Sequence, residues 1–189
     1  MLDCNTPEDE VIEKDLNLLI IQYAMSEEFI GHYFSYKELI ANSEKLNGDL
    51  WTYTKNAHIL QCFILWCNVF GSDSENNQTH WKHLIVNHSY GGFKARLLKE
   101  INMTDEEWHS NWKNIKEFRD SYAAHRDKEF NKVVPYLDNA YKAFLIYDEW
   151  IQYEAFKGTG VISLLKNLEE VAEEKKQKIK KDLNALLHK

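Results

Sequence analysis

Glycine and proline are scarce in this sequence, which has seven glycines and two prolines in 189 residues. Both residues interrupt regular structure and mark turns, so their scarcity leaves few places for the many turns of a strand-rich fold. Apolar residues instead recur at spacings of three and four along most of the chain, which is the period of a helix with one buried face. We therefore predict an all-α fold, an up-and-down bundle of about five to seven helices.

Cysteine and long apolar runs are also in short supply. The three cysteines, Cys4, Cys62 and Cys67, are odd in number and lack the spacing of a zinc site, which favours reduced thiols and a cytoplasmic location. The acidic N-terminus has no apolar signal core, and the longest apolar run, LNLLIIQYAM, is roughly half as long as a membrane span. We expect a cytoplasmic protein that has no membrane partner.

Positive charge is in deficit overall. The formal net charge of −7 and the sequence pI of about 5.6 exclude a general nucleic-acid binder, so any contact with RNA has to be local. Between Lys113 and Lys132, however, six basic residues outnumber four acidic ones, which gives a local charge of +2 that suits a phosphodiester. Two of the three arginines, Arg119 and Arg126, bracket His125 there, in FRDSYAAHRD.

The periodicity places the expected elements along the chain. Residues 1–160 are predicted to form one helical domain, and residues 161–189 a charged amphipathic helix that packs on the bundle or on a partner. Thr104 and Glu107 form a capping box that opens the helix carrying FRDSYAAHRD. Glycines in the segment after Trp81 (Gly91 and Gly92) should interrupt it, and Asp138 should cap the helix after Pro135. Further helices are expected over residues 8–45, 50–70 and 141–156.

The bracketed histidine has two interpretations. A histidine with a pKa of about 6.5 can take a proton from a ribose 2′-hydroxyl, while a nearby guanidinium holds the scissile phosphate. Alternatively, His125 continues the core stripe of its helix and the arginines are solvated flanks. Arg119 and His125 are six residues apart, about 120° around an ideal helix. A shared site therefore requires the helix to end or distort here, or two copies of the chain to face each other.

Four motifs occur in a particular order: an aromatic-rich helix ending in WCNVF, then HWKHL, TDEEW and FRDSYAAHRD. In this order they resemble the abortive phage-infection U-type branch of the HEPN superfamily, over residues 50–153. The resemblance implies a dimerising helical bundle and, in many members, a metal-independent ribonuclease whose site is composed at the dimer interface. Other members are non-catalytic modules for binding or dimerisation.

Carried over to this sequence, the resemblance assigns three catalytic residues. His125 would be the general base or acid, Arg119 the phosphate clamp, and Asp120 an orienting hydrogen-bond partner. On grounds of charge we add Arg126, Lys116 and Lys128 as RNA contacts. No cofactor and no metal are expected. The expected partners are a second copy of the chain, RNA as substrate or ligand, and a cognate antitoxin protein. The rival hypothesis is a non-catalytic dimeric module that binds RNA, a nucleotide or a protein partner.

Other groups of residues have weaker support as functional sites. Histidines 80, 83 and 88 invite a metal site, but no carboxylate or cysteine lies close in sequence to complete it. Trp108 and Trp112 share one face of their helix, where burial is favoured over stacking on RNA bases. The lysines near the C-terminus alternate with glutamates, which indicates a salt-bridged helix surface and not an RNA patch.

Overall fold

The computed structural model describes residues 7–76, 78–84, 90–124, 133–155 and 165–188. These residues form six α-helices and contain no strand, which confirms the all-α prediction. The helices are α1 (Pro7–Ala41), α2 (Asp49–Phe70), α3 (Tyr90–Ile101), α4 (Asp105–Phe118), α5 (Asp138–Trp150) and α6 (Leu168–Leu187). None of them combines the length and the apolar character needed to cross a lipid bilayer.

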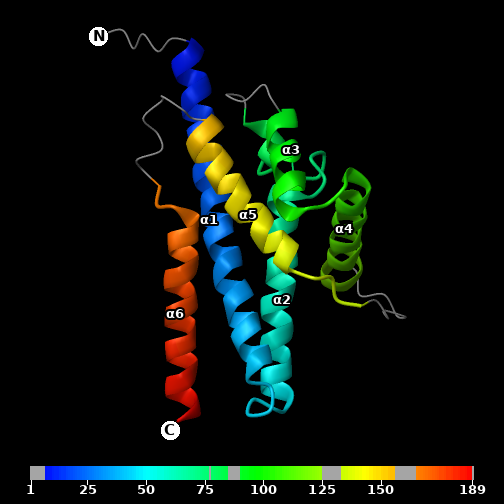
Figure 1. Cartoon of the computed structure of the whole chain (residues 1–189), viewed down its shortest axis with the longest axis vertical. Helices are drawn as coiled ribbons and strands as arrows, with labels where there is room; N and C mark the ends of the chain where they lie inside the picture. The colour runs from blue at the N-terminus through cyan, green and yellow to red at the C-terminus, as the bar shows by residue number, and fades with distance from the viewer. Residues whose placement is uncertain (1–6, 77, 85–89, 125–132, 156–164, 189) are drawn as a thin grey trace.

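An antiparallel pair, α1 and α2, forms the centre of the bundle (Figure 1). The two helices are joined by a tight turn, in which Gly48 has a φ of 97° that favours glycine. Figure 1 shows α6 along the outer side of α1, α5 crossing the pair diagonally and α4 beside α2. Helix α3 packs against α5. The helix that leads into the motif, α4, therefore lies at one edge of the bundle.

Aromatic side chains make up much of the core. Phe29 of α1 packs against Phe144 of α5 with 4.6 Å between ring centroids, and Trp66 of α2 meets Trp108 of α4 edge-on at 5.9 Å. Such edge-on and tilted pairs add to the stability gained by burying the rings themselves. On α4 the buried residues are Trp108, Ile115 and Phe118. They fix the rotation of α4 about its axis and so determine which of its polar residues face the neighbouring loop.

A buried carboxylate holds the start of the C-terminal helix. Asp148 of α5 accepts hydrogen bonds from the Leu168 backbone N–H at 2.9 Å and from the Gln152 side chain at 2.7 Å. Burial raises the pKa of Asp148 above its ordinary value, although these hydrogen bonds oppose the shift. Farther along α6, Leu183 packs with Leu39 and with the turn after α1. The charged C-terminal helix thus packs on its own bundle.

The start of α4 confirms the predicted capping box. The Thr104 hydroxyl accepts the Glu107 backbone N–H at 3.2 Å, and the Glu107 carboxylate accepts the Thr104 N–H at 2.8 Å. The prediction that Asp138 caps α5 was wrong, because Leu137 occupies the cap position and Asp138 is the first helical residue. Its carboxylate instead accepts hydrogen bonds from the Tyr33 and Tyr136 hydroxyls and from Lys37.

The two adjacent glycines do not break the chain as predicted. Gly91 and Gly92 lie in the first turn of α3, a helix that the sequence analysis did not predict. Glycine loses backbone freedom when it is fixed in a helix, and that cost is smaller in the first turn, where fewer intrahelical hydrogen bonds hold the chain, than in the interior. The apolar residues Phe93, Leu97 and Ile101 then supply the buried face of this helix.

Candidate functional site

The helix that carries the motif changes its geometry at Arg119. Helix α4 ends at Phe118 as a regular α-helix, and Arg119–Ala124 continues as a π-helical segment. A π-helix closes its hydrogen bonds over five residues instead of four, so it inserts an extra residue and rotates the chain beyond it relative to an uninterrupted α-helix. Such segments are frequent at functional sites. The helix is therefore distorted at the motif, and His125 lies outside the described residues.

Two carboxylates pair with Lys116 of α4 and with Arg119, the first residue of the π-helical segment. Arg119 Nη2 lies 3.2 Å from Glu75 Oε2, and Lys116 Nζ lies 3.2 Å from the other oxygen of the same carboxylate. Lys116 Nζ also donates to Asp120 Oδ2 at 2.9 Å. Arg119 Nε is 2.8 Å from Asp120 Oδ1, but its N–H is not aligned for a hydrogen bond, so this contact is purely electrostatic. We call these four residues, Glu75, Lys116, Arg119 and Asp120, the charged cluster.

The charged cluster is electrically balanced, with two positive and two negative side chains. The hydrogen bond from Lys116 to Asp120 raises the pKa of the lysine, and together with a contribution from Glu75 it outweighs the opposing effect of burial. Lys116 and Arg119 are 22% and 19% exposed, whereas Glu75 is 49% exposed. The cations are therefore sheltered and the bridging carboxylate faces solvent.

The buried thiol next to the charged cluster, that of Cys67, is chemically inert. Cys67 of α2 lies close enough to Arg119 and Asp120 to interact with both, but burial raises the pKa of its thiol to about 12. The Arg119 guanidinium offsets only part of that shift. A thiol in this state is not a nucleophile at neutral pH. Cys62 and Cys67 are both free and buried, in line with the prediction of reduced thiols, and Cys4 lies outside the described residues.

The structure thus brings together three of the six predicted site residues: Lys116, Arg119 and Asp120. The other three, His125, Arg126 and Lys128, lie outside the described residues, and their roles stay predictions. Glu75 is the member that sequence reasoning missed. It lies in the polar stretch GSDSENNQT, where no periodicity or spacing distinguishes one acidic residue from another.

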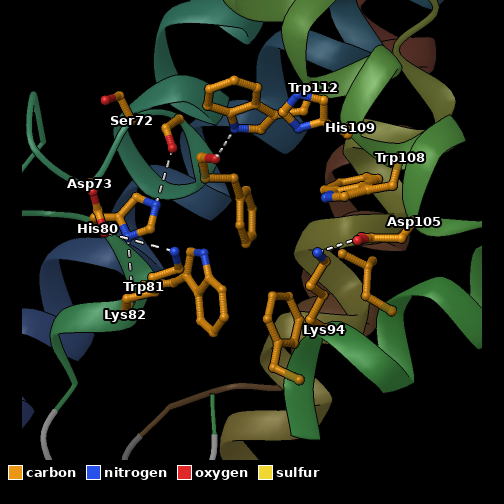
Figure 2. A pocket seen from close by; sticks show the side chains of 14 residues that line it. Ser72, Asp73, His80, Trp81, Lys82, Lys94, Asp105, Trp108, His109 and Trp112 are labelled. Carbon is orange, nitrogen blue, oxygen red and sulfur yellow. Dashed lines mark hydrogen bonds and ion pairs between the residues drawn. The ribbon is translucent and has the colours of Figure 1, made fainter. Parts of the chain in front are cut away.

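An aromatic pocket lies between α3, α4 and the loop after α2, and none of the four residues of the charged cluster lines it (Figure 2). Its volume is about 360 Å³. The walls are aromatic and the rim carries charged residues; Phe70, Trp81, Phe93, Trp108 and Trp112 form the walls, and Asp73, Lys82, Lys94, Asp105 and His109 lie around the rim. Lys94 pairs with Asp105 across the rim, and Lys82 lies 3.7 Å from Asp73.

The two tryptophans of α4 differ in their surroundings. Trp108 is 8% exposed and contacts Trp66 in the core, as predicted. Trp112 is half-buried, donates its indole N–H to the Phe70 carbonyl at 2.7 Å and stacks on His109 with ring centroids 5.7 Å apart. Trp112 therefore fastens α4 to the end of α2 and still presents part of its ring to the pocket. It lies one helical turn before Lys116.

His80 has a structural role in the loop beside this pocket. Its Nδ1 accepts the Lys82 backbone N–H at 3.3 Å, so Nε2 carries the proton that it donates to the Gly71 carbonyl at 3.2 Å. Burial lowers the pKa of His80 to about 4. With both ring nitrogens engaged, His80 has no lone pair for a metal ion. His88 lies outside the described residues, and no group of three possible metal ligands occurs within them.

A pair of histidines connects α1 and α2 at another place in the bundle. His32 Nδ1 lies 2.8 Å from His58 Nδ1, and Glu28 Oε1 lies 3.7 Å from the other nitrogen of His32. Burial lowers the pKa of both imidazoles below their ordinary value. One of the two rings must be neutral to accept the shared hydrogen bond. Nothing in the sequence indicated this pair, because its members lie on different helices.

Two lysines near the C-terminus pair with glutamates of α6, one from within the helix, as predicted, and one from just before it. Lys176 lies 3.6 Å from Glu173, and Lys166 contacts Glu174.

Comparison with known proteins finds no matching family model, no matching curated protein and no matching solved structure. The functional argument for this chain therefore depends on its own residues and geometry.

Proposed function

We propose that this protein is a HEPN-type, metal-independent endoribonuclease that acts in phage defence or as the toxin of a toxin–antitoxin pair. The observation that carries the proposal is the pair of sheltered cations, Lys116 and Arg119, at the point where α4 becomes π-helical. Both cations precede His125 by fewer than ten residues in a stretch of net positive charge. A phosphate-binding group and a titratable imidazole are thus supplied by one short segment.

The chemistry follows from the residue types. The His125 imidazole accepts the proton of a ribose 2′-hydroxyl, and the 2′-oxygen attacks the adjacent phosphorus. The bond from phosphorus to the 5′-oxygen breaks, which leaves a 2′,3′-cyclic phosphate on one fragment and a 5′-hydroxyl, protonated by imidazolium or water, on the other. Arg119 neutralises charge that develops on the phosphate oxygens, while Asp120 attracts its guanidinium and helps to keep it in place. The residue types of this segment therefore supply both a base and a phosphate-binding group.

A second copy of the chain completes the proposed site. Arg119 and His125 would lie about 120° apart on an ideal helix, and the π-helical segment between them changes that angle without in itself bringing both side chains to one face. A two-fold axis that passes near the motif would bring Arg119 of one subunit opposite His125 of the other. We therefore propose a homodimer in which each subunit supplies part of the site, with a cognate antitoxin as its inhibitor.

The experiment that tests this function is incubation of the pure protein with a defined single-stranded RNA in EDTA. We expect cleavage by the wild type and a loss of about a hundredfold or more in rate for His125→Ala, because a positioned general base contributes at least that much. Circular dichroism of the variant checks that it is folded. An unchanged cleavage rate in the folded variant would exclude His125 from catalysis.

A non-catalytic module that binds a nucleotide is the second candidate, and the aromatic pocket favours it. Its tryptophan walls match the faces of a base, and Lys82 and Lys94 on the rim match a phosphate. Titration with AMP and UMP, followed by tryptophan fluorescence, tests this function. Quenching that saturates at micromolar nucleotide, together with no RNA cleavage, supports the module. No quenching up to millimolar nucleotide rules it out.

A further inference from the structure

We propose that Glu75 is an internal competitor for RNA: its carboxylate occupies the phosphate site of Lys116 and Arg119, and RNA binds by displacing it. This inference depends on the proposed function, because the displacing group is a phosphodiester of RNA. It adds a control element to that function and assigns a role to a residue outside the sequence motif.

The geometry of Glu75 is that of a bound anion. Its two oxygens are shared between two cations, Oε1 with Lys116 Nζ and Oε2 with Arg119 Nη2, each at 3.2 Å. A phosphodiester also presents two unesterified oxygens and can bridge an ammonium and a guanidinium in the same way. The site that holds Glu75 is therefore shaped and charged for a phosphate.

Glu75 is the replaceable member of the charged cluster. Its side chain is 49% exposed, and ion pairs with a carboxylate in such contact with water are weak. Asp120, by contrast, lies on the same helical segment as its partners and stays beside them when a ligand arrives. With Glu75 in place the cluster is neutral, and once Glu75 has turned away the remaining three side chains carry one net positive charge. The exchange therefore creates the charge that holds the incoming phosphate.

The backbone around Glu75 can stay in place during this exchange. On one side of Glu75, Asn76 makes backbone and side-chain hydrogen bonds to the Ser72 carbonyl at 3.0 and 2.8 Å. Farther along the loop, the Thr79 hydroxyl donates a hydrogen bond to the Asn68 carbonyl at 2.8 Å, and the His80 side chain donates one to the Gly71 carbonyl. Because the loop is fastened on itself and to α2, rotation of the Glu75 side chain alone exposes both cations.

Binding of an uncleavable RNA measures the competition directly. We would titrate a fluorescent, fully 2′-O-methylated single-stranded RNA into the full chain and record its anisotropy, since this probe cannot be cut at a blocked 2′-oxygen. Glu75→Gln keeps the size of the side chain and removes its charge. We expect this variant to bind the RNA about threefold to tenfold more tightly than the wild type, because two weak ion pairs no longer oppose the phosphate.

The control variant is Glu106→Gln, which removes the same charge from an exposed position in the first turn of α4. Its affinity for the RNA should equal that of the wild type. A second arm, in which inorganic phosphate competes with the RNA, distinguishes a phosphate site from a site for the bases. Phosphate should displace RNA at a lower concentration from Glu75→Gln than from the wild type.

The outcomes separate this inference from the proposed function. If Arg119→Ala loses RNA binding while Glu75→Gln binds like the wild type, Glu75 is no competitor and the RNA site stands. If Glu75→Gln and Glu106→Gln improve binding equally, the effect is one of overall charge and the inference is wrong. If Arg119→Ala binds RNA as well as the wild type, there is no phosphate site at Arg119, and the inference and the proposed function both fail.

Discussion

Arg119 and Glu75 lie 44 residues apart in the sequence, and their side chains meet with 3.2 Å between Nη2 and Oε2. The contact ties the motif-bearing helix to the loop after α2. It also fixes the guanidinium at the junction of α4 with the π-helical segment. The carboxylate neutralises this guanidinium until it turns away, so the contact opposes the binding of a phosphate.

Replacing Arg119 by alanine should abolish RNA cleavage without unfolding the protein. We expect a loss of about a hundredfold to a thousandfold in rate, comparable to the removal of one donor to a developing negative charge. Its ion pairs are partly exposed, so the free energy of unfolding should change by about 1 kcal/mol or less. Single-turnover cleavage and urea denaturation measure the two quantities.

A matched control for this variant is Lys113→Ala on the same helix. Lys113 is 63% exposed and pairs with Glu117 at 3.7 Å. Removing its charge should leave the cleavage rate within about twofold of the wild type, since an exposed pair contributes little. Equal losses in Lys113→Ala and Arg119→Ala would mean that general positive charge, and not the position of the guanidinium, supports activity.

Mixed dimers test whether the site is shared between subunits. Arg119→Ala and His125→Ala are each expected to be inactive alone. After unfolding and refolding together, a mixed dimer contains one site with an intact Arg119 from one subunit and an intact His125 from the other. About a quarter of wild-type activity should return, because half of the dimers are mixed and each holds one complete site. No recovery from verified mixed dimers would place both residues of a site in the same subunit.

The buried imidazole of His80 should make the protein less stable in weak acid. Unfolded His80 takes up a proton near its ordinary pKa of about 6.5, whereas the folded state keeps it neutral down to about 4. The unfolded state therefore binds more protons between these values, and the free energy of unfolding falls as the pH drops through this window. Between pH 7 and pH 5 the loss for one fully shielded histidine is at most about 2 kcal/mol.

The variant that isolates this effect is His80→Asn. Asparagine is a good N-cap and keeps an acceptor for the Lys82 N–H, but it does not titrate. Urea denaturation at pH 7 and pH 5 should show a smaller loss of stability for the variant than for the wild type. Identical losses would assign the acid sensitivity to other groups, such as His32 and His58, whose pKa values burial also lowers.

The capping box of the motif helix should contribute measurably to stability. Thr104→Ala removes the acceptor for the Glu107 N–H and should lower the free energy of unfolding by about 1 kcal/mol. For a chain of this size we expect the melting temperature to fall by about 2–4 °C. Thr52→Ala, at an exposed position inside α2, is the control and should leave it nearly unchanged. An unaffected Thr104→Ala would mean that burial of Trp108 and Ile115 alone fixes the start of α4.

Much of the fold could be predicted because helices have local sequence signals. The spacing of apolar residues found α1 and α2 to within four residues at each end, and the Thr104–Glu107 pattern identified the start of α4. The failures have tertiary causes. Asp138 has the residue type of a cap, but Tyr33 and Lys37 of α1 bind its carboxylate instead. The buried face of α3 outweighs its two glycines, which sequence reasoning took for an interruption.

The candidate site was only half predictable for a similar reason. Lys116, Arg119 and Asp120 are close in sequence, and a helix brings residues with this spacing together. Glu75 reaches them from a loop between distant elements, and only the packing of α4 against α2 sets that distance. The π-helical geometry of Arg119–Ala124 has no sequence signal of its own, although the need for a distortion near the motif could be deduced from the spacing of Arg119 and His125.

The measurement that tests the account most directly is the chemical identity of the cut ends. The wild-type protein would be incubated with a defined RNA in EDTA, and the fragments would be analysed by mass spectrometry. We predict 2′,3′-cyclic phosphate and 5′-hydroxyl ends, formed by attack of the 2′-oxygen and absent after treatment with Arg119→Ala or His125→Ala. Fragments with 5′-phosphate and 3′-hydroxyl ends, or ends that both variants produce as fast as the wild type, would contradict a ribonuclease site at Arg119 and His125.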